Sequence, residues 1–167
     1  MENQKQHVLP KFYLKGFSLD NKGTHLAIFD VTSNLFIPSG NLKGQGYEDW
    51  LYGKDGKIEK ALAEIESLSA PILTTIRNTK KLPVHGSTDF YRLLRFSILM
   101  SSRNPMSAKE TTEMQLRMKQ TLESMSPGSL SGMNPMNKLE ALTMILGNLD
   151  TVSACCEDLN AKLLLNQ

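Results

Sequence analysis

The sequence predicts an α+β fold, mainly α, built as a helical bundle with a small N-terminal β-hairpin. Apolar residues recur at three- and four-residue steps over most of the chain after residue 57, which is the spacing of helices that bury one face. Before that point, a run of β-branched and aromatic residues of strand length lies between turn-forming segments.

The length of 167 residues and the 40% hydrophobic content favour one domain over residues 1–167 with a single core. Its β structure comes first and its helices follow. We expect a short helix, the hairpin and an aromatic loop over 1–56, core helices over 57–125, a flexible loop over 126–134 and C-terminal helices over 135–167.

The first expected element is a helix of one or two turns over residues 10–17. Pro10 has the fixed φ of a first helical turn. Turn-forming residues at 20–23 end this helix. The apolar side chains available for burial on it are Phe12, Leu14 and Phe17.

The hairpin follows this short helix. Residues 24–31 (THLAIFDV) predict a strand, and residues 34–38 predict a weaker one that Pro38 confines to an edge. After a loop at 41–46, three large aromatic residues between 47 and 52 are expected to cap the core.

The longest helix begins at Lys57 and carries one apolar stripe over about 20 residues. Pro71 should kink it, because the proline ring displaces a backbone hydrogen bond. The next helix has Ser87 or Thr88 as its cap. It ends near Arg103, because the following residue precedes a proline and is pushed out of helical geometry.

This second long helix is expected at the centre of the bundle, because apolar side chains surround it nearly completely. Its one polar face holds Arg92, Arg95 and Arg103.

Ser107 and Glu110 form the pattern of a capping box for a surface helix. The thin apolar edge of that helix consists of Met114, Met118, Leu122 and Met125. Residues 126–134 are too rich in Gly and Ser to pack. A last helix is expected to restart at Asn134-Pro135 and to continue its apolar spacing to Leu163, with Gly147-Asn148 as the point where it could split.

Residue usage excludes several classes of protein. No apolar run approaches the roughly 18 residues of a membrane helix, so no membrane contact is expected. Cys155 and Cys156 are adjacent and have no further cysteine or histidine cluster, which favours a reduced, cytoplasmic environment. The sequence contains no Gly-rich phosphate loop, no Gly-x-Ser-x-Gly elbow and no His-Glu-x-x-His motif.

The net charge of +2 hides an uneven distribution. Residues 77–119 hold nine basic and three acidic side chains, whereas residues 120–167 hold two basic and five acidic ones. A basic centre could follow a phosphate backbone, although it could also be a solvated face without a ligand. The candidate nucleic-acid-binding residues are Arg77, Lys80, Lys81, Arg92 and Arg95.

Four motifs in the same order resemble one family. Residues 7–17 (HVLPKFYLKGF) resemble the HYVPxFYLRxF opening of a mainly bacterial family catalogued as domain of unknown function 4238. Later signatures of that family resemble residues 49–52 (DWLY), 58–66 (IEKALAEIE) and 102–105 (SRNP). The sequence departs from the pattern at Val8, where tyrosine is usual, and at Asn104, where threonine is common.

Members of that family typically continue into a second half with a Ser-Asp-Asn-Pro type segment, which this sequence does not contain. The resemblance therefore implies either a short member or a fragment. A catalytic centre that needs residues from the second half would be incomplete here.

The candidate catalytic residues are His7, Glu59, Glu66 and Arg103. A histidine beside a rigid proline could act as a base or a metal ligand, although a lone histidine before a helix more often caps backbone groups or packs. The two glutamates lie about 20° apart around one helix, so they could act as acid and base or hold a divalent cation, the candidate cofactor. We favour the alternative that they form salt bridges with arginines of the neighbouring helix.

Two functions of different classes fit these observations, and whether the chain is an enzyme stays open. In the first, it is the N-terminal part of a cytoplasmic enzyme that acts on nucleic acid or nucleotides, as a toxin-like or phage-defence effector. In the second, it is a non-enzymatic helical module that binds a protein partner or a second copy of itself through its methionine edge and acidic C-terminal helices. The polar motifs and the basic centre favour the first slightly.

Overall fold

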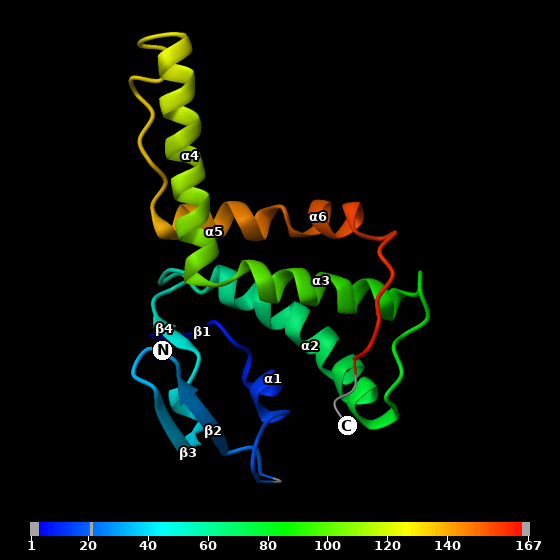
Figure 1. The fold of residues 1–167 in the computed structure, drawn as a ribbon. Helices are drawn as coiled ribbons and strands as arrows, with labels where there is room; N and C mark the ends of the chain where they lie inside the picture. The colour runs from blue at the N-terminus through cyan, green and yellow to red at the C-terminus, as the bar shows by residue number, and fades with distance from the viewer. Residues whose placement is uncertain (1–3, 21, 165–167) are drawn as a thin grey trace. The chain divides into compact units, whose positions relative to one another are not determined.

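The computed structural model describes residues 4–20 and 22–164. The chain forms two compact units, the first unit Met1–Gly56 and the helical unit Lys57–Gln167. Their boundary falls where the sequence separates the hairpin region from the helices, and the prediction of a single domain stays a prediction. Within the described residues the fold is mainly helical with small N-terminal two-stranded sheets, as predicted (Figure 1).

The first unit contains the predicted short helix and hairpin. Its elements are β1 (Lys5–His7), α1 (Lys11–Lys15), β2 (His25–Asp30), β3 (Leu35–Asn41), the 3-10 helix η1 (Leu42–Gly44) and β4 (Tyr47–Asp49). β2 and β3 are antiparallel, with Phe29 opposite Phe36. β3 continues past Pro38, which a two-stranded sheet tolerates because each strand keeps one edge without a partner strand.

A second two-stranded sheet, absent from the sequence predictions, pairs β1 with β4. The strands are antiparallel, with Lys5 opposite Asp49 and His7 opposite Tyr47. Each strand has only three residues, so neither shows a recognisable alternation of apolar and polar side chains.

The core of the first unit includes a small cluster of leucines. Leu14 of α1, Leu26 of β2 and Leu42 of η1 are buried together, with Leu9 and Ile28 packed against them. Leu14 therefore takes the buried position expected for it. In contrast, the Phe17 side chain is 64% exposed, because α1 ends at Lys15 and leaves this residue beyond the helix.

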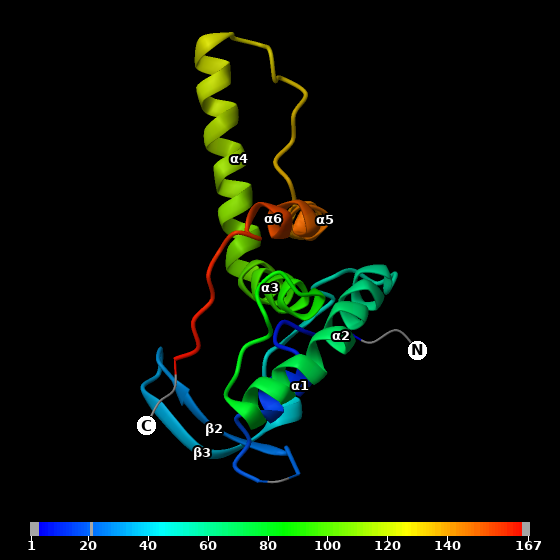
Figure 2. The same ribbon diagram turned by 90° about the vertical axis from the view of Figure 1, so that its right-hand side faces the viewer.

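The helical unit is organised around α3. Its elements are α2 (Lys57–Thr79), α3 (Thr88–Ser102), α4 (Pro105–Met125), α5 (Lys138–Gly147) and α6 (Leu149–Cys155). α3 contacts all four of the other helices and lies between α2 and the α5–α6 pair in both views (Figures 1 and 2). The predicted central position of this helix is confirmed, with Phe90, Phe96 and Leu99 buried along it.

The helix starts show which predicted caps are correct. Ser87 caps α3, and its hydroxyl accepts a hydrogen bond from the Phe90 N–H at 3.2 Å. The capping box predicted at Ser107 is wrong. α4 starts earlier because Pro105 occupies its first turn and the preceding Asn104 accepts the Ser107 N–H at 2.9 Å. α2 continues as one helix through Pro71.

Two predicted limits of the C-terminal helices are wrong. α5 does not restart at Asn134-Pro135 but at Lys138, where Asn137 and Glu140 form a capping box. The predicted division is confirmed, since Asn148 separates α5 from α6. The last helix ends at Cys155 instead of continuing to Leu163, and two acidic residues follow, which oppose the negative end of a helix dipole.

Hydrogen bonds attach the segment 126–134, which the sequence predicts to be flexible, to α4. The Glu123 carboxylate accepts the N–H groups of Gly128 and Leu130, each at 2.7 Å. Lys119 Nζ donates to the Met133 carbonyl at 2.5 Å. The segment therefore runs back beside α4, as both ribbon views show.

Candidate functional site

A buried ion pair joins two of the predicted site residues. Arg103 follows the last residue of α3, and its side chain is only 2% exposed. Its Nη1 donates to Glu66 Oε1 of α2 at 2.6 Å. These two residues therefore meet as the salt-bridge alternative predicted. Arg103 does not share a solvated face with Arg92 and Arg95, because it is enclosed by the helices.

The other two candidate catalytic residues lie elsewhere. Glu59 is in the first turn of α2, about two turns before Glu66. His7 belongs to β1 in the first unit, where its main-chain carbonyl accepts the Tyr52 hydroxyl at 3.3 Å. The structure brings Glu66 and Arg103 into contact, and a catalytic role for all four residues stays a prediction.

Gln6, next to His7, is a key residue that the sequence predictions missed. Its side chain is 1% exposed, and its amide is bonded at both ends. Nε2 donates to the Gly53 carbonyl at 2.7 Å, and Oε1 accepts the Tyr52 N–H at 2.5 Å. No local pattern signals this role, because both partners lie more than 40 residues away in sequence.

The five predicted nucleic-acid-binding residues separate into two groups. Arg77, Lys80 and Lys81 are exposed at the end of α2, where Lys80 adopts a positive φ of 57°. Arg92 and Arg95 form the second group, in which each side chain lies close to a carboxylate. Arg92 forms an ion pair with Asp89 of its own helix at 3.2 Å. Arg95 Nε lies 2.5 Å from Asp150 Oδ1 of α6, at an angle outside hydrogen-bond geometry.

A groove of about 390 Å³ lies between the end of α2 and the start of α3. Its apolar lining includes Ile72, Ile76 and Leu82, and its basic side chains are Lys81 and Arg92. Asp89 is the one acidic residue lining it. The structure therefore brings two of the predicted basic residues to one apolar cavity.

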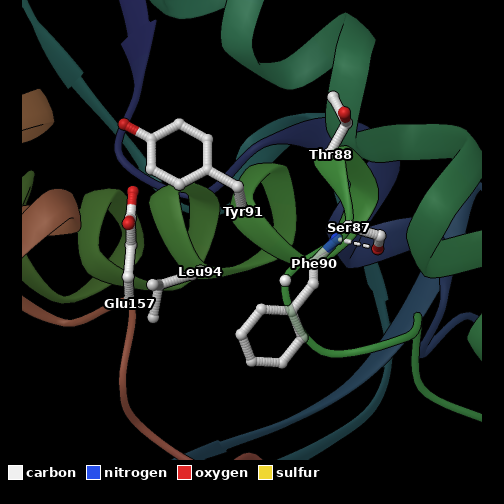
Figure 3. A pocket seen from close by; sticks show the side chains of 7 residues that line it. Ser87, Thr88, Phe90, Tyr91, Leu94 and Glu157 are labelled. Atoms are coloured by element: carbon white, nitrogen blue, oxygen red, sulfur yellow. Dashed lines mark hydrogen bonds between the residues drawn. The ribbon is translucent and has the colours of Figure 1, made fainter.

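A second pocket, of about 300 Å³, lies at the start of α3 (Figure 3). Phe90, Tyr91 and Leu94 form its apolar lining, and Glu157 reaches it from the turn after α6. Figure 3 shows the Tyr91 hydroxyl and the Glu157 carboxylate on the same side of the pocket. The sequence predictions treated Phe90 and Tyr91 only as core residues.

The predicted methionine edge of α4 is on the surface. Met114, Met118, Leu122 and Met125 are 56%, 57%, 44% and 77% exposed. Their three- and four-residue spacing places them along one side of the helix. This stripe is the longest exposed apolar row on a helix of this unit, within the part of the chain that the structure describes.

The Asp20 carboxyl is the most strongly perturbed acid described in the first unit. Hydrogen bonds from the Thr24 hydroxyl and the Thr24 N–H, the latter at 2.9 Å, lower the pKa of Asp20 to about 2. His25 adds a smaller effect in the same direction, with Nδ1 at 3.6 Å from the carboxylate. The Asp20 carboxylate lies just before β2, and its hydrogen bonds with Thr24 stabilise the turn that leads into the hairpin.

Two features are absent from the described residues. Across residues 4–20 and 22–164, no three His, Cys, Asp or Glu side chains are placed to hold a metal ion. Nor is any described helix long and apolar enough to cross a membrane. Both cysteines are free thiols.

Comparison with known proteins gives one match. A family profile described as Protein of unknown function (DUF4238) matches residues 5–161, nearly the whole chain. That range includes all four segments whose motifs resemble the family. No curated protein and no solved structure matches the chain.

Proposed function

The chain belongs to the DUF4238 family of proteins of unknown function, and we propose that its helical unit is a non-enzymatic interaction module that binds a second copy of the chain through α4. The observation that carries this proposal is the exposed stripe Met114, Met118, Leu122 and Met125. The ion pair of Glu66 with Arg103 supports a structural use of these residues, and so favours this function over an enzyme.

The composition of the stripe suits a binding surface. Methionine is unbranched and polarizable, so it adapts to an opposing surface, and it is common at binding faces. Rows of exposed apolar side chains mark interaction sites in soluble proteins more often than single exposed residues do. A partner helix laid along α4 would bury the row.

The order of residues in the stripe supports a second copy as the partner. In an antiparallel pair of α4 helices centred on the stripe, Met114 of each copy would lie opposite Met125 of the other, and Met118 opposite Leu122, because these two pairs have nearly the same midpoint in sequence. A row that is complementary to itself when reversed is what a two-fold interface requires.

Size-exclusion chromatography with light scattering over a range of concentrations tests this proposal. We expect the full chain to form a dimer that dissociates on dilution, and Met118→Glu to make it monomeric. Gln120→Glu is the matched control, because it places the same charge about 200° away around the same helix.

A pair of opposite charges tests the antiparallel arrangement. Met114→Glu or Met125→Lys alone should weaken the dimer, and the double variant should restore it, because the two new charges would lie opposite each other across the interface. A wild-type chain that stays monomeric at every usable concentration would remove the proposal.

A second candidate function is an enzyme acting on nucleic acid, of a toxin-like or phage-defence kind. The exposed bases Arg77, Lys80 and Lys81 favour it, because none has an ion-pair partner among the described residues. In this function the catalytic residues are His7, Glu59, Glu66 and Arg103, with a divalent cation as the candidate cofactor.

Binding and cleavage of RNA and DNA, with and without divalent ions, test this second function separately. Replacing the three bases by Gln should lower affinity and reduce the salt dependence of binding, and Lys109→Gln, which changes an exposed base on α4, is the control. Glu59→Gln and Glu66→Gln should abolish cleavage. No binding even at low salt would exclude nucleic acid as the substrate.

A further inference from the structure

The pocket at the start of α3 has one charged lining residue, Glu157. Its other walls are the rings of Phe90 and Tyr91, the Leu94 side chain and small polar groups. No lysine or arginine lines it, whereas the groove beside it is lined by Lys81 and Arg92. These two cavities therefore differ in the charge that they favour.

We propose that this pocket binds an organic ammonium cation through Glu157 and Tyr91 rather than Phe90, because the Phe90 ring is 6% exposed and packs against the His85 ring with centroids 4.8 Å apart. An ammonium group is attracted to the face of an aromatic ring, most strongly where the group is shielded from water. Figure 3 shows the Glu157 carboxylate beside the Tyr91 ring. The volume of about 300 Å³ is at the lower end for ligand pockets, so it fits a small alkylated amine.

The start of α3 offers a competing attraction for anions, because a helix N-terminus carries partial positive charge. That charge is already used locally. The Ser87 hydroxyl accepts the Phe90 N–H at 3.2 Å, and Asp89 supplies a carboxylate in the first turn. The dipole effect falls off within one turn, whereas Leu94 lies in the second turn. The Glu157 carboxylate and the Tyr91 ring therefore decide that the pocket prefers cations to anions.

Choline is a suitable probe, titrated into the full-length chain and followed by backbone amide shifts in NMR. Saturable shifts should concentrate at Tyr91, Leu94 and Glu157. The uncharged carbon isostere, with a tert-butyl group in place of trimethylammonium, should bind about tenfold more weakly, because it keeps the shape and loses the charge. Acetate serves as the anionic probe and should give no saturable shifts at these amides.

Two pairs of variants distinguish the contribution of the Glu157 carboxylate from that of the Tyr91 ring. Glu157→Gln should weaken choline binding about tenfold, whereas Asp158→Asn, which removes the neighbouring carboxylate outside the pocket, should leave it unchanged. Tyr91→Leu removes the aromatic ring and should weaken choline binding. Tyr91→Phe keeps the ring and should bind choline like the wild type.

Three results would overturn the proposal: equal affinity for choline and its isostere, tighter binding of acetate than of choline, or no saturable shifts at these amides with millimolar choline. Choline binding should not depend on self-association through α4, because Met118 does not line the pocket. Met118→Glu should therefore bind choline like the wild type.

Discussion

Arg103 Nη1 and Glu66 Oε1 lie 2.6 Å apart and join the end of α3 to α2. The guanidinium is almost fully enclosed, with 2% of the side chain exposed, whereas the Glu66 side chain is 23% exposed. A charge enclosed to this extent depends on its partners, because removing one partner leaves the charge poorly compensated. The pair therefore ties two helices of the unit together.

Glu66→Gln should lower the free energy of unfolding of the helical unit by about 2 kcal/mol, because the amide replaces a charged acceptor of Arg103. Denaturant unfolding followed by circular dichroism would measure the loss. Glu64→Gln, two residues earlier and exposed on the same helix, is the control and should change it by about 0.5 kcal/mol at most. Equal stability of the two variants would contradict this assignment.

Gln6→Leu should destabilise the first unit by about 3 kcal/mol, because the Gly53 carbonyl and the Tyr52 N–H both lose the Gln6 amide. Trp50, the single tryptophan, reports on this unit through its fluorescence during denaturant unfolding. Gln4→Leu removes one exposed bond to Asp49 and should change stability little. If both variants unfolded at the same denaturant concentration, Gln6 would not have this role.

Asn104→Ala should cost about 1 kcal/mol, because α4 loses the acceptor for the Ser107 N–H. Asn104→Thr should retain most of the stability, since threonine also caps helices. Thermal unfolding should show the wild type as the most stable, Asn104→Thr next and Asn104→Ala as the least stable. An alanine variant as stable as the wild type would show that the cap contributes nothing.

Asp20 should titrate near pH 2 when its carboxyl carbon is followed by NMR. Since its folded pKa is about 2 and its ordinary value is 3.8, ionised Asp20 stabilises the fold fully above pH 3.8. That stabilisation is lost as the pH falls toward about 2. Thr24→Val should raise the pKa of Asp20 toward its ordinary value, and Thr24→Ser, which keeps the hydroxyl, should not. A wild-type titration at the ordinary value would refute this.

Local spacing predicted much of the fold. The apolar stripes gave the long helices, and Ser87 marked the start of α3 because a hydroxyl there completes a helix end. The sheet of β1 and β4 could not be predicted, since two three-residue strands meet only after a separation of about 40 residues. The end of the last helix at Cys155 was missed because periodicity continues beyond it, although exposed Leu159 and Leu164 have no surface that buries them.

The candidate sites were predictable to a smaller extent. Pairing of Glu66 with an arginine of the next helix followed from their shared edge, but the choice of Arg103 over Arg92 and Arg95 depended on how α3 ends. Glu157 could not be placed beside Tyr91 from sequence, because a turn after α6 carries it there and no repeat spans that distance. Tertiary contacts, not local preference, decide such positions.

The central position of α3 implies unequal local stability within the helical unit. Opening α3 would break its contacts with all four other helices at once, so its amides, such as that of Leu99, belong to the slowest class for hydrogen exchange. The C-terminal end of α4 is bonded to the 126–134 segment, and this end can fray while α3 and its contacts stay closed. Exchange protection would therefore decline from α3 outward along α4.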